Sequence, residues 1–224
     1  MQLAPAVRQL IRAEQERGYR NLAIKLGLGA NPEKAYERLS GVRVSETLHS
    51  PYEHPNRYLI MERLFAGIQK GMAAAKMVPL RPTPAFATLP SGNISARLII
   101  EHKTHVPVIF FEQGLFEFFR DFCHLIGWAV PPLSPRHLSD DEALTKLAHG
   151  YTMPFQASDF FIRSLGSYAF EGSPMLTGQR VPAPQHNMPV CMALLTLMER
   201  FVMCHEIGHI TSVRFVEPSF LVSV

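Results

Sequence analysis

Two histidines four residues apart lie near the C-terminal end of this 224-residue chain, in the segment Met198–Ile210. On a helix, residues i and i+4 lie on one face a turn apart, so His205 and His209 can direct both imidazoles to one point. Glu206 follows the first histidine and is rotated by roughly 100° from it. The composition predicts roughly 0.03 chance occurrences of this pattern. An apolar helical face leads into it, formed by Leu194, Leu195, Leu197, Met198, Phe201 and Val202.

These residue types suit a metal-dependent hydrolysis. Neutral imidazole is a good zinc ligand at about 2.0–2.1 Å, and zinc lowers the pKa of its water to roughly 7. A carboxylate beside that water can take its proton and pass it to a leaving amine. We therefore predict His205 and His209 as ligands of Zn²⁺ and Glu206 as the general base. The alternative is a buried helix whose histidines are satisfied by hydrogen bonds.

The segment Met198–Ile210 resembles the active-site helix of the zincin metallopeptidases, which share the HExxH motif. The resemblance covers 13 residues or so and implies the same roles for His205, Glu206 and His209. It also implies a peptidase that acts on a protein or peptide substrate. In that superfamily an edge strand above the motif helix pairs with extended substrate. The segments 94–100 and 107–111 are the candidates for this strand, and an ordinary core strand is the alternative.

A catalytic zinc normally has three protein ligands, and the third is not evident here. The zincin branch with the longer motif HExxHxxGxxH is excluded, because Ser212 and Phe215 occupy its glycine and last histidine positions. The other large branch takes a glutamate from a later helix. Glu217 is the single carboxylate after His209 and becomes the candidate, although Pro218 biases it toward an extended conformation. Lone upstream candidates are His124, His149 and His186.

The segment 211–224 is apolar and stops without a polar finish. One hypothesis is that the chain is truncated at its C-terminus, so that a second ligand helix is absent and zinc binding is weak. A related alternative is a catalytically incomplete zincin-like interaction protein. A third is a di-iron carboxylate protein, because Glu206–His209 and Glu46–His49 both have the pattern Glu-x-x-His used in four-helix bundles. The β-prone middle of the chain argues against a bundle.

The composition excludes several classes of protein. Hydrophobic residues make up 47% and charged residues 18% of the chain, enough for a core and too apolar for a disordered protein. A net charge of +3 gives no strong field for nucleic acid, so no nucleic-acid partner is predicted. The N-terminus lacks the apolar core of a signal peptide, and no apolar stretch is long enough to span a bilayer. Three cysteines without metal spacing indicate reduced core residues in a cytoplasmic protein. The oligomeric state is not predicted.

Periodicity predicts a mainly helical α+β fold with a small, mostly antiparallel sheet and the motif helix near the C-terminus. We divide the chain into an N-terminal helical region, 1–78, and a zincin-like catalytic region, 79–224, which together can form one continuous domain. A proline-rich loop over 172–189 is expected to form a wall or lid of the cleft. Helices are predicted at 4–27, 31–38, 56–76, 114–126, 139–147 and 158–170, and short strands at 85–89, 94–100 and 107–111.

Overall fold

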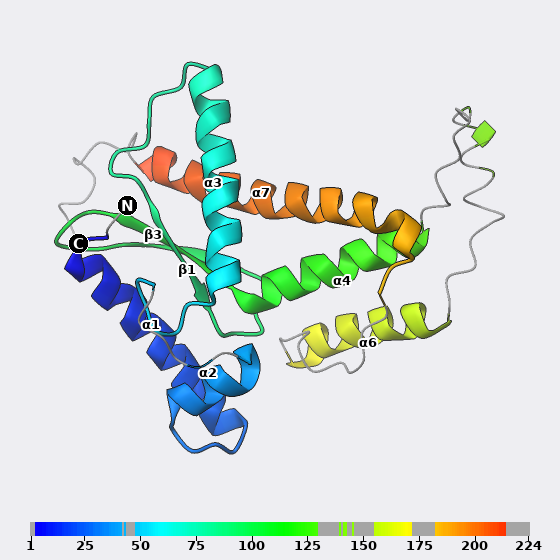
Figure 1. The fold of residues 1–224 in the computed structure, drawn as a ribbon, viewed down its shortest axis with the longest axis horizontal. Coiled ribbons are helices and arrows are strands. Elements are labelled where there is room, and N and C mark those ends of the chain that lie inside the picture. The colour runs from blue at the N-terminus through cyan, green and yellow to red at the C-terminus, as the bar shows by residue number, and fades with distance from the viewer. Residues whose placement is uncertain are drawn as a thin grey trace, which may run out of the picture. The chain divides into compact units, whose positions relative to one another are not determined.

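The structure is a computed structural model that describes residues 3–41, 43, 48–129, 139, 141–142, 145, 155–171 and 182–213. The predicted class, mainly helical α+β with a small sheet and a long helix near the C-terminus, is confirmed (Figure 1). The elements are α1 (Pro5–Lys25), α2 (Pro32–Ser40), α3 (Pro55–Ala74), β1 (Ala85–Leu89), β2 (Ala96–Ile100), β3 (Pro107–Glu112), α4 (Gln113–Ala129), α6 (Phe155–Glu171), the 3-10 helix η1 (Gln185–Asn187) and α7 (Met188–Val213).

The chain forms two compact units. The first comprises the described parts of residues 1–91 and 95–113, together with α7 from Arg200 onward. The second comprises residues 92–94 and the described parts of 114–199. The boundary that we predicted after residue 78 therefore falls inside the first unit, where α1 and the sheet share a core.

The sheet of the first unit has the strand order β1-β3-β2. Strands β2 and β3 pair antiparallel, as predicted, whereas β1 and β3 pair parallel with Ala85 opposite Val108. The central strand is therefore β3, and all of its residues are buried. The sequence alternative in which 107–111 is the edge strand is wrong, because β3 has a neighbour on both sides.

One stripe of α1 packs against this sheet. Its buried residues recur every four positions: Val7, Ile11, Gln15, Tyr19 and Ala23. The first two join Ala85, Ala87, Leu89, Val108 and Phe110 in a core. Farther along, the tyrosine rings of residues 19, 36 and 52 have centroids 5.3 to 6.0 Å apart. Ile24, the next residue along, is 60% exposed, because Ala23 takes the buried position in the last turn.

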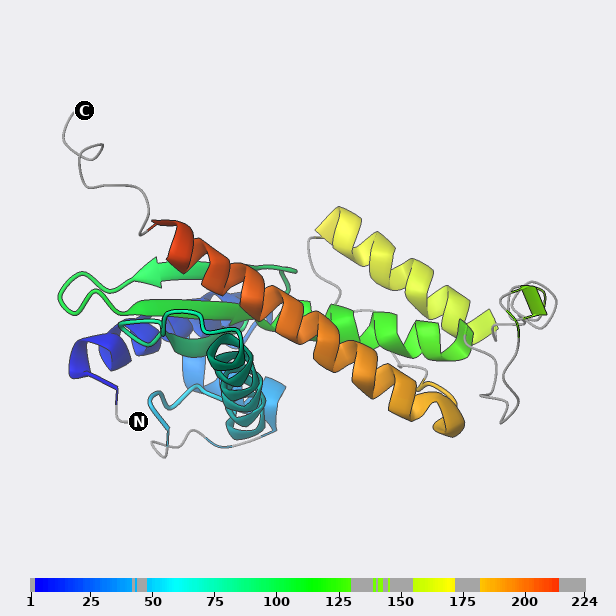
Figure 2. The same ribbon diagram turned by 90° about the horizontal axis from the view of Figure 1, so that it is seen from above.

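In the first unit, the C-terminal half of α7 crosses α3 (Figures 1 and 2). Met203, Ile207 and Ile210 form its buried face at helical spacing. A Cβ added to Gly67 of α3 would lie 3.7 Å from the Arg200 guanidinium, an ordinary van der Waals contact with the end of a flexible side chain. No described helix combines the length and the apolar character that crossing a membrane requires.

The second unit has a small core around two buried cysteines, Cys123 and Cys191, with Ala183. The Asn187 side chain donates to the Gly127 carbonyl over 2.7 Å. Cys204 of the first unit, in contrast, is exposed, so the prediction of three core cysteines is wrong for this one. It lies on the solvent-facing side of α7, a position that the apolar character of cysteine does not reveal.

Two predicted segments are described only in part. Ser139 and Glu142 exchange the reciprocal hydrogen bonds of a capping box, from the Ser139 amide to the Glu142 carboxylate at 3.0 Å and from the Glu142 amide to the Ser139 hydroxyl at 3.3 Å. The remainder of the helix predicted at 139–147 lies mostly outside the described residues. Of the proline-rich loop, residues 172–181 also lie outside them, and η1 and the first turn of α7 occupy its end.

Gly114→Ala is expected to destabilise the second unit. A Cβ at Gly114 would lie 2.2 Å from the Gly92 carbonyl oxygen and 2.7 Å from that of Asn93, so the backbone must shift. Overpacking of this kind costs about 1–3 kcal/mol. The control is Gly166→Ala in α6, where an added Cβ meets nothing within 4 Å. That change should stabilise the helix by up to about 1 kcal/mol. Thermal unfolding measures both variants, and equal stabilities would contradict the packing argument.

Candidate functional site

Helix α7 places the two motif histidines on its exposed face and the glutamate on its buried face. His205 and His209 are exposed, whereas Glu206 is 7% exposed. The difference follows from the helical phase, since Met203, Glu206 and Ile210 fall on the buried side and the two histidines fall on the opposite side. The imidazoles are therefore open to solvent, and the carboxylate beside them is shielded.

The two imidazoles converge. Their Nε2 atoms form a hydrogen bond of 3.1 Å, and the ring planes meet at 85° with centroids 4.6 Å apart. Two imidazoles on a tetrahedral zinc, with bonds of about 2.05 Å, would have nitrogens about 3.3 Å apart. Only a few tenths of an ångström separate the two arrangements. The histidine pair thus fits a divalent metal ion with little rearrangement.

Glu206 completes the group. Its carboxylate and the two imidazoles each offer one ligand atom, and these three atoms all lie within 4.8 Å of one another. The carboxylate is therefore close enough to the imidazoles to belong to the same metal-binding group. The general-base role that the sequence predicted for Glu206 stays a prediction.

Gly208, between the two motif histidines, borders open space. An added Cβ would meet nothing within 4 Å among the described residues, so no second backbone packs there. Instead, the hydroxyls of Thr211 and Ser212 donate to its carbonyl over 2.8 and 2.9 Å. The two pockets described in the first unit, of about 430 and 330 Å³, are lined by residues outside α7. The candidate site is thus an open helix face.

The third ligand remains a prediction. Glu217 and His149 lie outside the described residues. His124 of α4 and His186 of η1 belong to the second unit. Burial lowers the pKa of His124, whereas His186 is exposed. Within the described part of the chain, the group that can hold a metal consists of His205, Glu206 and His209. If Glu206 acts as the base, this group supplies two of the three protein ligands that a catalytic zinc normally has.

The other chemistry-bearing patterns have different outcomes. His49, from the second Glu-x-x-His pattern, lies in a bend and not on a helix, while its partner Glu46 is outside the described residues. A four-helix di-iron site needs this pattern on facing helices, so His49 gives that hypothesis no support. The segment 94–100, in contrast, contains β2, an edge strand with partly exposed residues.

Sequence reasoning missed a buried carboxylate. Glu53 is 2% exposed, and its Oε2 accepts hydrogen bonds from the Gln15 side chain at 2.7 Å and the Thr88 amide at 3.0 Å. Its Oε1 accepts from the Thr88 hydroxyl at 2.8 Å. Burial outweighs these bonds and raises the pKa of Glu53 to about 7. The only sequence signal was a polar Gln15 on the apolar stripe of α1, and it does not identify the partner.

Comparisons with protein-family models, with curated proteins and with solved structures find no match to this chain. The case for a function therefore depends on the geometry of α7.

Proposed function

We propose that this protein is a zinc-dependent peptidase whose metal is held on α7. One observation carries the proposal: two solvent-exposed imidazoles bring their Nε2 atoms within 3.1 Å of each other, with a buried carboxylate oxygen within 4.8 Å. Imidazole also suits copper, iron and nickel, so the choice of zinc depends on the adjacent glutamate and the resemblance to zincins. The proposed compartment is the cytoplasm.

Each residue has a separate role in the proposed reaction. His205 and His209 hold the ion through Nε2. When bound, zinc lowers the pKa of a coordinated water to roughly 7 and polarises the carbonyl of the scissile bond. Glu206 accepts the proton of the attacking water and donates it to the amine that leaves when the C–N bond breaks. Because Glu206 is shielded, its carboxylate is held close to the helix and does not swing into solvent.

A peptide substrate is supported by the sheet. β2 is an edge strand, and among the described residues β3 is its only strand neighbour. Its free backbone groups can pair with an extended peptide, as in β-augmentation. The other edge strand, β1, is buried along its whole length. We therefore assign substrate binding to β2.

Metal binding tests the site directly. We expect one zinc ion per chain in competition with a chromophoric chelator, and we expect His205→Ala and His209→Ala each to lower the affinity more than about tenfold, because each removes one of two described ligands. His102→Ala, which removes an exposed histidine from the β2–β3 turn, is the matched control. Cys204→Ser tests whether the neighbouring exposed thiol contributes.

The metal titration also separates the proposal from its main alternative. An interaction protein with a zincin-like helix is favoured by the exposure of both imidazoles and by the two-ligand set. This alternative predicts that both histidine variants bind zinc as weakly as the wild type does. It also predicts that the wild type does not hydrolyse a fluorogenic peptide library. Zinc-dependent hydrolysis that disappears with either histidine would exclude that alternative.

A further inference from the structure

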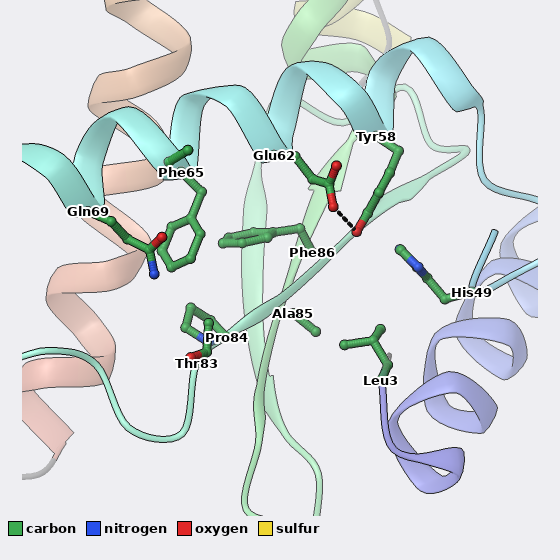
Figure 3. Close-up of a pocket in the computed structure, with 11 residues that line it drawn as sticks. Leu3, His49, Tyr58, Glu62, Phe65, Gln69, Thr83, Pro84, Ala85 and Phe86 are labelled. Carbon is green, nitrogen blue, oxygen red and sulfur yellow. Dashed lines mark hydrogen bonds between the residues drawn. The ribbon is translucent and has the colours of Figure 1, made fainter. Parts of the chain in front are cut away.

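The first unit contains a pocket of about 430 Å³ between α3 and the chain that enters β1 (Figure 3). Its volume is within the range of small-molecule sites. Tyr58, Glu62 and Phe65 of α3 face it from one side, and Pro84 and Phe86 border it from the other. Because no residue of α7 lines this pocket, it is separate from the proposed zinc site.

One end of the pocket is polar. The Tyr58 hydroxyl donates to the Glu62 carboxylate over 2.6 Å, and the two residues lie one turn apart on α3 (Figure 3). The His49 ring packs edge-on against the Tyr58 ring, with centroids 4.2 Å apart. Nε2 of His49 is shielded from solvent and has no hydrogen-bond partner among the described residues. A buried polar atom of this kind needs a partner that the described residues do not supply, and a bound molecule or a water can provide it.

The other end is apolar. The ring centroids of Phe65 and Phe86 lie 4.8 Å apart. Both side chains are buried, and so are Pro84 and Ala85. Figure 3 shows the Phe86 ring extending from β1 toward Phe65 below α3. These surfaces can hold an aromatic or aliphatic body of a ligand, because aromatic faces provide large contact areas with preferred geometries.

Glu62 supplies the formal charge among the described residues that line the polar end. Burial lowers the pKa of His49 and raises that of Tyr58, so both are neutral at pH 7. Among the described lining residues, none therefore cancels the charge of Glu62; Arg8, which also acts on His49, is not one of them. An ionised carboxylate only accepts hydrogen bonds, and the Tyr58 oxygen keeps a lone pair after donating. This end therefore suits a ligand that donates.

We propose that this pocket binds a small organic cation with an ammonium head and an apolar body. The head donates to the carboxylate of Glu62 and to the oxygen of Tyr58, while the body packs against Phe65 and Phe86. Charge-assisted hydrogen bonds are stronger than neutral ones, which gives the site its selectivity for the charge of the head.

Two probes with the same aromatic body and opposite charge test the proposal. The full chain is titrated with 2-phenylethylamine and with 3-phenylpropionate, and binding is followed by protein NMR. We expect the amine to bind at least tenfold more tightly than the acid. Glu62→Gln should weaken amine binding at least fivefold, whereas Glu37→Gln, an exposed glutamate of α2, should leave it unchanged. Equal binding of amine and acid, or an unaffected Glu62→Gln variant, overturns the proposal.

Steric block gives a second test. Ala66 is exposed and borders the pocket, so Ala66→Trp should fill it and abolish amine binding without disturbing the core. Ala73→Trp, at an exposed position of the same helix outside the pocket, is the control. Absence of saturable amine binding to the folded wild type up to about 10 mM also overturns the proposal, since a ligand of this size should bind more tightly than that. These outcomes do not depend on the peptidase assays.

Discussion

Glu206→Gln is expected to abolish peptide hydrolysis while the protein keeps its zinc. Glutamine has the shape of glutamate and fits the same buried position, but it cannot accept the proton of the attacking water. General acid–base groups contribute about 10²- to 10⁴-fold to the rate, and kcat should fall by this factor. Because His205 and His209 are unchanged, zinc content by mass spectrometry should equal that of the wild type.

The matched control for Glu206→Gln lies on the same helix. Glu199→Gln makes the same chemical change at a partly buried residue of α7 that is outside the metal-binding group. It should retain activity and zinc. Loss of zinc in Glu206→Gln would mean that the carboxylate is a ligand and not a base. Unchanged turnover in a zinc-loaded Glu206→Gln variant would contradict the proposed mechanism.

The stability of the protein is expected to fall between pH 4.5 and pH 7 because of Glu53. Its pKa rises from 4.5 in the unfolded chain to about 7 in the fold, so the folded state holds a proton that the unfolded state has lost. The contribution of Glu53 to the free energy of unfolding is fully present below pH 4.5 and is lost as the pH rises through 7. The difference in pKa corresponds to about 3 kcal/mol of unfolding free energy.

Glu53→Gln isolates this effect. The amide can accept from Gln15 and from the Thr88 amide through its oxygen and donate to the Thr88 hydroxyl through its nitrogen, which preserves the network. Urea unfolding should show similar stabilities at pH 4.5 and a variant more stable by up to about 3 kcal/mol at pH 8. Glu199 and Asp121, whose pKa values burial raises to about 7 and about 6, are present in both proteins and cancel in the difference. If the unfolding free energies of the wild type and of Glu53→Gln depend on pH in the same way, this account is contradicted.

Most of the local structure was predictable because it depends on neighbouring residues. Asn31 accepts from the Lys34 amide over 3.0 Å and starts α2 at Pro32, as its type and position indicated. The strand predicted at Ala85–Leu89 has the same bounds in the structure. The convergence of His205 and His209 is likewise local, because the spacing of four residues fixes it once the segment is helical.

The sequence by itself therefore determined the helices, the strands and the pairing of the two imidazoles, all of which arise within a few residues of chain. Tertiary structure decided which face each element buries. It made β3 central, left the histidines in solvent while Glu206 is shielded, and buried Glu53 against Gln15, 38 residues away. It also packed the His49 ring against the Tyr58 ring of α3. Such contacts join residues distant in sequence, and the periodicity of one segment carries no information about its partner.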